Sequence, residues 1–125
     1  AEDREQIVAL HLRDGSRAWA AGLGPAFLSR IAGDGSRATP SLSGDSVVAL
    51  SGSGELLSVN ANTGDELWRH NILKEAGAEL LVHGVCGSPL IHEGRVYVFP
   101  GGRSHSAVLA FAFTTLASAS ARRRW

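Results

Sequence analysis

Five histidines and one cysteine are the side chains of this sequence best suited to bind a metal ion. His83 lies three residues before Cys86, the only cysteine. A structural zinc site needs four ligands at characteristic spacings, and these two residues do not supply it. We therefore predict no metal site, and we expect His83 to be a partly exposed loop residue and Cys86 a small buried thiol. The remaining histidines share no such spacing: His11, His70, His92 and His105.

Four aspartates that could act as catalytic acids or bases stand beside glycine or serine: Asp14, Asp34, Asp45 and Asp65. An aspartate in this setting usually closes a turn by accepting backbone N–H groups. Residues 60–64 faintly resemble a calcium loop, but they lack its later acidic ligands. The sequence also has no Gly-x-Ser-x-Gly nucleophile motif, and Gly52-Ser53-Gly54 lacks the third glycine of a dinucleotide fingerprint. We therefore assign no catalytic residue.

Composition narrows the function classes further. The 125 residues include 12 basic and 12 acidic side chains, for a formal net charge of zero. A protein held on nucleic acid by charge needs a basic excess, so we predict no nucleic-acid partner. A single cysteine excludes an intrachain disulfide, and no apolar run is long enough to span a bilayer. The start of the chain carries no targeting signal.

The strongest pattern in the sequence is an internal repeat with a spacing of 49 residues. Residues 58–68 match residues 9–19, with a turn glycine and a tryptophan in register. Residues 39–42 and 46–50 likewise match 88–91 and 95–99. After Gly101-Gly102 the third copy gains three residues, so that 56–59 match 108–111. The repeat shows that one structural unit recurs along the chain.

Each repeat unit predicts four short strands, at residues 38–43, 46–51, 55–60 and 66–71 in the complete copy. The first copy supplies two strands, at 5–12 and 16–21, and residues 74–79 predict one helical turn. Connections this short require antiparallel pairing. Four strands per ~50 residues are typical of a propeller blade. The sequence thus predicts an all-β fold: a partial β-propeller of about two and a half four-stranded antiparallel blades.

The repeat also divides the chain. We predict the end of a blade at 1–23, with its third and fourth strands, and one full blade with its entry link at 24–72. An incomplete third blade follows at 73–113, and 114–125 is a degenerate or frame-disrupted tail. A closed propeller has at least four blades, so we expect a fragment of a longer protein or a chain that pairs with its own copies. Its uncovered end faces predict aggregation or oligomers for the isolated chain.

The repeat resembles the pyrroloquinoline-quinone (PQQ) type repeat of quinoprotein-like β-propellers. That unit runs small-apolar-Asp-x-x-Thr-Gly-x-x-x-Trp; residues 58–68 match it with Asn60 for the Asp, and 9–19 match with Asp14 where Thr is usual. The link residues 37–40, 73–78 and 84–90 resemble a branch labelled as relatives of the outer-membrane assembly lipoprotein. In that branch a tryptophan is usual where this chain has His83.

The resemblance implies a structural role for one set of residues. In the family the repeat tryptophan docks one blade on the next, with the turn residues around it. The residues that this implies for blade docking here are Trp19, Trp68, Gly15, Gly64 and Thr63. We expect Trp68→Ala to destabilise the fold strongly and Trp125→Ala not to do so.

Two functions follow from the resemblance. The first is a non-catalytic interaction or scaffold platform in the periplasm or elsewhere outside the cytoplasm. Its partners would be the remaining blades and other proteins. The alternative is a PQQ-dependent alcohol or sugar dehydrogenase, with PQQ and calcium as cofactors and its catalytic elements in further blades. The adjacent cysteine pair of many such enzymes is absent from this chain, and we identify no cofactor-binding residue. We favour the scaffold.

Overall fold

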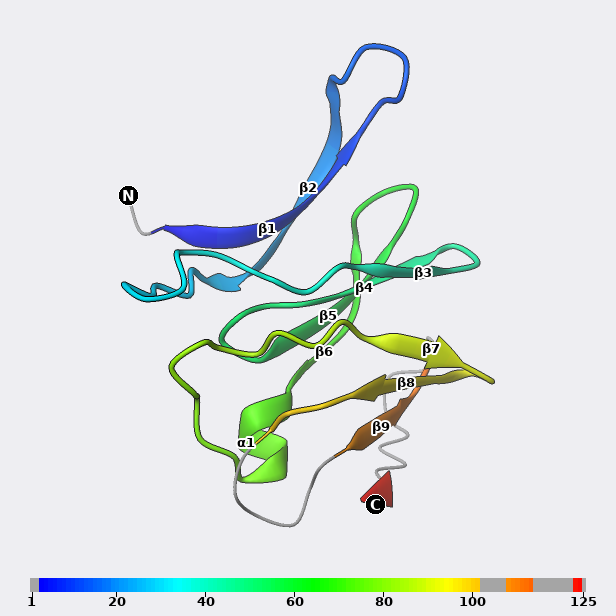
Figure 1. Ribbon diagram of the computed structural model, residues 1–125. Coiled ribbons are helices and arrows are strands. Elements are labelled where there is room, and N and C mark those ends of the chain that lie inside the picture. Colours follow the sequence, from blue (N-terminus) through cyan, green and yellow to red (C-terminus); the bar gives the residue numbers. More distant parts are fainter. Residues whose placement is uncertain (1–2, 102–107, 114–122, 125) are drawn as a thin grey trace.

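The computed structural model describes residues 3–101, 108–113 and 123–124, and it shows three antiparallel sheets packed one after another (Figure 1). The first sheet pairs β1 (Arg4–Leu10) with β2 (Arg17–Pro25). The middle sheet has the order β3-β4-β5-β6, and the third has the order β10-β9-β8-β7. The one helix in this described part, α1, is short. The predicted all-β partial propeller is therefore confirmed.

The middle sheet is the complete repeat unit. Its strands are β3 (Ser41–Ser43), β4 (Ser46–Leu50), β5 (Glu55–Asn60) and β6 (Glu66–Asn71). The last two coincide with the predicted strands at 55–60 and 66–71. The predicted strand at 38–43 forms a ladder only over its last three residues, which pair with β4.

Both faces of the middle sheet are covered, which explains the unbroken apolar run in β4. Val47 and Ala49 pack toward the first sheet, whereas Val48 and Leu50 pack toward the third sheet. Successive side chains of a strand point to opposite faces, so a strand buried on both sides needs apolar residues at every position.

The third sheet contains β7 (Leu90–His92), β8 (Arg95–Val98), β9 (Leu109–Ala112) and β10 (Arg123–Arg124). β10 pairs antiparallel with β9, in the place that a fourth strand takes in the middle sheet. It falls in the segment predicted as a degenerate tail, most of which, residues 114–122 and 125, lies outside the described residues.

β2 extends beyond its predicted end because it contains a β-bulge. Glu5 is paired with Gly24 and the next residue, Gln6, with Gly22, so Leu23 is an extra residue on β2. A bulge of this kind bends a strand and interrupts the regular alternation of its backbone groups. β2 runs to Pro25, four residues past the predicted strand end at 21.

α1 (Ile72–Ala76) follows β6 directly and begins the link to the third sheet. Asn71 caps it by accepting a hydrogen bond from the Lys74 N–H, and Gly77 ends it in the left-handed conformation with φ 62°. The helical turn predicted at 74–79 thus lies slightly earlier, where the two capping residues place it.

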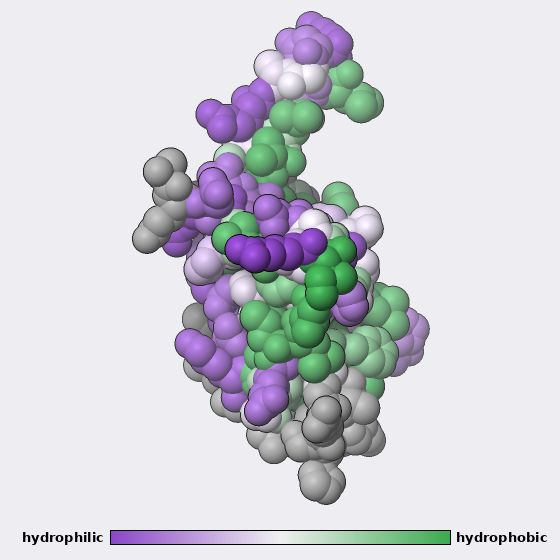
Figure 2. Space-filling view, turned by 60° about the vertical axis from the view of Figure 1, so that its left-hand side comes forward, coloured by the Kyte–Doolittle hydropathy of each residue, from purple (hydrophilic) through white to green (hydrophobic). Residues whose placement is uncertain are grey.

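The links that join successive sheets lie at one end of the sheets, on the left of Figure 1. Phe27 in the first link packs closely on Gly52 and Gly84, which belong to the β4–β5 turn and the second link. Figure 2 shows apolar side chains gathered on this side of the molecule. Exposed apolar residues of the links are Leu28, Ile31, Leu80, Leu81 and Val82. No helix in the described segments is long and apolar enough to cross a membrane.

Candidate functional site

Several polar, charged and aromatic side chains of the described residues lie at two contacts between sheets. We call the contact of the first sheet with the middle sheet the first junction, and that of the middle sheet with the third sheet the second junction. The buried core of the first junction consists of Ile7, Leu23, Val47, Ala49, Leu57 and Val59. Polar and aromatic groups surround it.

Trp19 connects β2 to the β5–β6 turn at the first junction. Its indole N–H donates a hydrogen bond of 2.9 Å to the Ala61 carbonyl. Its ring lies against Gly64, where a Cβ would come within 2.7 Å of two indole carbons. Gly64 has φ 78°, a conformation that side chains disfavour. Only glycine therefore satisfies both the turn and the ring at this position.

The turn that carries Gly64 is held by its own polar side chains. The Asn60 Oδ1 accepts hydrogen bonds from the Asn62 and Thr63 N–H groups. The Thr63 hydroxyl donates to the Asp65 carboxylate at 2.8 Å. Thr63 itself is exposed, and its bonds with Asp65 stabilise the shape of the turn. The turn presents Ala61 and Gly64 to Trp19.

Glu5 is a buried carboxylate that bridges three segments of the first junction. It is only 7% exposed. One carboxylate oxygen accepts a hydrogen bond of 2.9 Å from the Phe27 N–H in the first link. The other accepts one of 3.2 Å from the Gly52 N–H in the β4–β5 turn. A buried carboxylate is costly unless both oxygens are hydrogen-bonded, and here both are.

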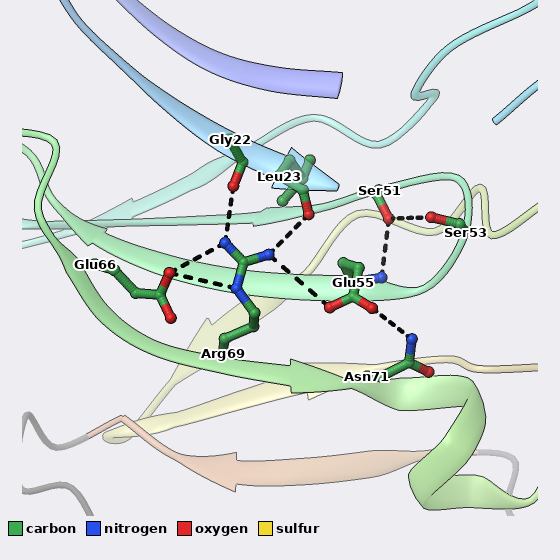
Figure 3. A network of polar contacts seen from close by, with 8 residues as sticks. All are labelled: Gly22, Leu23, Ser51, Ser53, Glu55, Glu66, Arg69 and Asn71. Carbon is green, nitrogen blue, oxygen red and sulfur yellow. Dashed lines mark hydrogen bonds and ion pairs between the residues drawn. The ribbon is translucent and has the colours of Figure 1, made fainter. Parts of the chain in front are cut away.

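Arg69 on β6 makes the largest polar network of the first junction (Figure 3). Its two terminal nitrogens donate to the Gly22 carbonyl at 2.8 Å and the Leu23 carbonyl at 2.9 Å. Glu66 binds the same guanidinium at 3.1 Å, and Glu55 lies 3.9 Å from it. The network joins β5 and β6 of the middle sheet to the backbone of β2.

The second junction is dominated by apolar and aromatic side chains. Trp68 is half-buried, and its ring centroid lies 5.4 Å from that of His70. His70 in turn stacks on Phe111 of β9, with centroids 4.3 Å apart. The His70 Nδ1 is 2.8 Å from a carboxylate oxygen of Glu75 in α1. The aromatic series thus connects β6 to the third sheet.

The polar bonds of the second junction lie between its links and inner strands. The Thr39 N–H donates to the Ser88 hydroxyl at 2.8 Å, and the Ser41 hydroxyl donates to the Pro89 carbonyl. Arg37 reaches the His83 carbonyl at 3.3 Å. These contacts fix the second link against the first, whereas the sheets themselves meet through apolar side chains.

Gly15 lies in the β1–β2 loop, away from both junctions. A Cβ added there would meet nothing within 4 Å among the described residues. The neighbouring Asp14 accepts hydrogen bonds from the Ser16 hydroxyl and N–H, which lower the pKa of its carboxyl below the ordinary value of 3.8. The docking role that the resemblance gives to Gly15 stays a prediction.

The prediction for Cys86 is wrong, because its side chain is exposed. Val85 takes the inward position in this part of the link and is buried in the core of the second junction. The chain then turns Cys86 outward, and its thiol donates to the His83 carbonyl at 3.2 Å. His83 is exposed, as predicted. His105 and Trp125 lie outside the described residues.

Glu5 and Arg69 are the two residues of the first junction that the sequence analysis missed. Neither belongs to a motif, and their partners are backbone groups between 22 and 47 residues away in the sequence. The one available signal was Glu5 itself. Glu5 stands two residues before Ile7 in β1, so the two side chains lie on the same face of the strand, and Ile7 is apolar and buried.

A PQQ or calcium site would need carboxylates free to bind a ligand. In the described part of the chain, no three histidine, cysteine or acidic side chains come together as a metal site would require. Glu5 holds backbone amides, Glu66 holds Arg69, and Asp65 accepts from Thr63. These residues do not fit the cofactor, and no catalytic step is derived from them.

Comparison with known proteins decides the family. A family profile described as "Outer membrane protein assembly factor BamB" matches residues 1–125, the whole of the chain. The chain belongs to this family. The PQQ-like repeat identified from the sequence is thereby confirmed, whereas a search of curated proteins finds no match.

Several solved structures are similar to this chain. The quinohemoprotein alcohol dehydrogenase from Comamonas testosteroni is 21% identical, with a TM-score of 0.66 over 96% of this chain and 18% of that chain. A europium-containing methanol dehydrogenase is 18% identical, with a TM-score of 0.61 over 94% and 20%. BamB from Moraxella catarrhalis is 18% identical, with a TM-score of 0.44 over 90% and 41%. The chain thus spans about a fifth of the two dehydrogenases, and the likeness to them shows the fold alone.

Proposed function

We propose that this chain forms consecutive blades of a longer PQQ-like propeller that acts as a rigid, non-catalytic interaction scaffold outside the cytoplasm. One observation supports this most directly: two ionic side chains, Glu5 and Arg69, hold the first and middle sheets together. Both carboxylate oxygens of Glu5 accept backbone N–H groups, and the Arg69 guanidinium is shared between two carbonyls and Glu66. The carboxylate of Glu75 is likewise engaged, by the His70 ring of the adjacent strand β6.

In this proposal Trp19 and Trp68 dock neighbouring blades, together with the turn residues Gly64 and Thr63. Gly15 would do the same against the sheet that precedes it. The indole of Trp19 on Gly64 supports the assignment, because it spans two sheets through both a ring contact and a hydrogen bond. The location outside the cytoplasm is supported by the family description, which names outer-membrane protein assembly.

The competing function is a PQQ-dependent dehydrogenase. The test is to supply the complete protein with PQQ and Ca²⁺ and to follow dye-linked oxidation of alcohols and sugars, together with the melting temperature. We expect no turnover and no rise in melting temperature. PQQ-dependent dye reduction would overturn the scaffold. A matched sample without PQQ controls for background oxidation of the dye.

The complete gene provides a second, independent test. An adjacent cysteine pair with an acidic calcium cluster in the other blades would favour the dehydrogenase. A lipoprotein signal without these elements would favour the scaffold.

A further inference from the structure

We infer that Arg69 is the specificity-determining residue of the first junction: it recognises a β-bulge in the neighbouring sheet and thereby fixes which sheet can pack there. The inference rests on the proposed function, in which these sheets are consecutive blades. It concerns how similar blades find the correct neighbour.

The first step is the geometry of the bulge. In a regular strand, consecutive carbonyl groups point to opposite edges, so one side chain cannot bind two in a row. In β2 the extra residue Leu23 breaks this alternation. The Gly22 and Leu23 carbonyls consequently both receive hydrogen bonds from Arg69.

The second step is the match between this pair of carbonyls and a guanidinium. Arginine presents several N–H groups in one rigid plane, which suits two acceptors side by side better than an ammonium does. Glu66 and Glu55 of the middle sheet hold the plane in position, and Glu55 is itself bound by Asn71 at 2.7 Å. Residues of the middle sheet therefore orient the Arg69 guanidinium toward β2 (Figure 3).

The third step is that the repeat does not reproduce this pair of carbonyls. The positions 49 residues after Gly22 and Leu23 are Asn71 and Ile72, where β6 gives way to the cap and first residue of α1. The next carbonyl, that of Leu73, accepts bonds from the end of the helix. The middle sheet has a bulge of its own, with Leu67 as the extra residue of β6, but that bulge matches the second register shift of β2, at Ala9/Leu10. It therefore offers the third sheet no bulge at the position of Leu23.

The positions that match Arg69 in the preceding and following repeats are Ala20 and Ala121, and neither residue has a charge. Arginine and bulge thus occur together only at the first junction within the described segments. A sheet without the bulge would not present both acceptors, so the charged hydrogen bonds to Gly22 and Leu23 would be lost, which disfavours the wrong neighbour.

A double-mutant cycle on the full chain tests the inference. Gly24→Ala disturbs the bulge, because Gly24 has φ 151° and a Cβ there would lie 3.1 Å from the Glu55 side chain. Arg69→Met removes the fork but keeps a long stem. We expect the two changes to be non-additive, with a coupling of about tenfold in the unfolding equilibrium constant. Gly24→Ala with Arg95→Met, an exposed arginine of β8, is the matched control and should be additive.

Hydrogen exchange supplies a local measurement that does not need the Gly24 variant. Arg69→Met should accelerate exchange of the β1 and β2 amides about tenfold and leave the β8 and β9 amides unchanged. Arg69→Lys should resemble Arg69→Met, since one ammonium does not replace a planar fork.

Additive effects in the cycle, equal acceleration in all sheets, or full protection in Arg69→Lys would each overturn the inference. None of these measurements involves a cofactor or a partner protein. If the protein proved to be a dehydrogenase, the proposed scaffold function would be wrong, but these measurements would still test the role of Arg69.

Discussion

Trp19 and Trp68 stand at the same position of two successive repeats, yet the junctions they belong to are built differently. Trp19 lies on a glycine and donates a hydrogen bond to a backbone carbonyl, in a junction that also contains a buried carboxylate and a hydrogen-bonded guanidinium. Trp68 belongs to an aromatic series that continues through His70 to Phe111. A shared repeat position hence fixes where a large side chain goes, but not what it contacts.

The difference has a physical consequence. Side-chain bonds to backbone groups are directional and are lost when the partner moves by a fraction of an ångström. Apolar packing depends on area and volume and tolerates small shifts better. The first junction should therefore be the more selective of the two, and the second the more tolerant of substitution.

The largest effect is expected from the tryptophans. Trp19→Ala should lower the free energy of unfolding by about 3 kcal/mol, through lost burial and the lost bond to Ala61. Trp68→Ala should cost a similar amount, as judged from its packing against the second junction. Denaturant unfolding of each variant measures this. Small and equal effects from Trp68→Ala and Trp125→Ala would contradict a docking role for Trp68.

The next largest effect separates two glycines with the same backbone conformation. Gly64→Ala should cost about 3 kcal/mol, because the new methyl group meets the Trp19 ring in addition to the left-handed strain. Gly15→Ala shares the strain, with φ 71°, but meets no neighbour among the described residues, so about 1 kcal/mol is expected. Thermal unfolding of the pair measures the difference. Equal costs would show that the ring contact contributes nothing.

A smaller effect of opposite sign is expected at the second junction. Ser58 lies beside Trp68 in the β5–β6 ladder, and within the described structure its hydroxyl is buried without a hydrogen-bond partner. Ser58→Ala should therefore be neutral or stabilise by up to about 1 kcal/mol. The control is Ser51→Ala. The equally buried Ser51 hydroxyl accepts a hydrogen bond from the Glu55 N–H, so its removal should lower the free energy of unfolding. A loss of stability in Ser58→Ala as large as in Ser51→Ala would contradict this.

The smallest effect is expected in the turn at residues 11–16, which occupies the same place in its repeat as the turn at 60–65. The Ser16 hydroxyl lowers the pKa of Asp14, so Ser16→Ala should raise that pKa toward 3.8. The folded pKa lies below the unfolded one, so the stabilisation is present at neutral pH and is lost as the pH falls below about 4, through the folded pKa. NMR titration of Asp14 in both forms measures the shift. An unchanged pKa in Ser16→Ala would show that the backbone hydrogen bond alone lowers the pKa of Asp14.

Much of the fold could be predicted from the sequence because its signals are local and repeated. The strands at 55–60 and 66–71 were predicted at their observed bounds, and the continuous apolar run of β4 is typical of a strand covered on both faces. The β2 bulge was not predicted, although glycines inside a strand, here Gly22 and Gly24, often mark one. Cys86 was misplaced because the inward position of its link depends on how Val85 meets the core.

The sequence by itself determined the repeat, the antiparallel strands within each unit and the positions of the tryptophans. These follow from alternation, turn residues and spacing along a few neighbouring residues. Only the tertiary structure decided how the units are joined. The partners of Glu5 and Arg69 are backbone groups brought close by the packing of one sheet on the next. No pattern along the chain encodes such contacts, because every residue offers the same backbone groups.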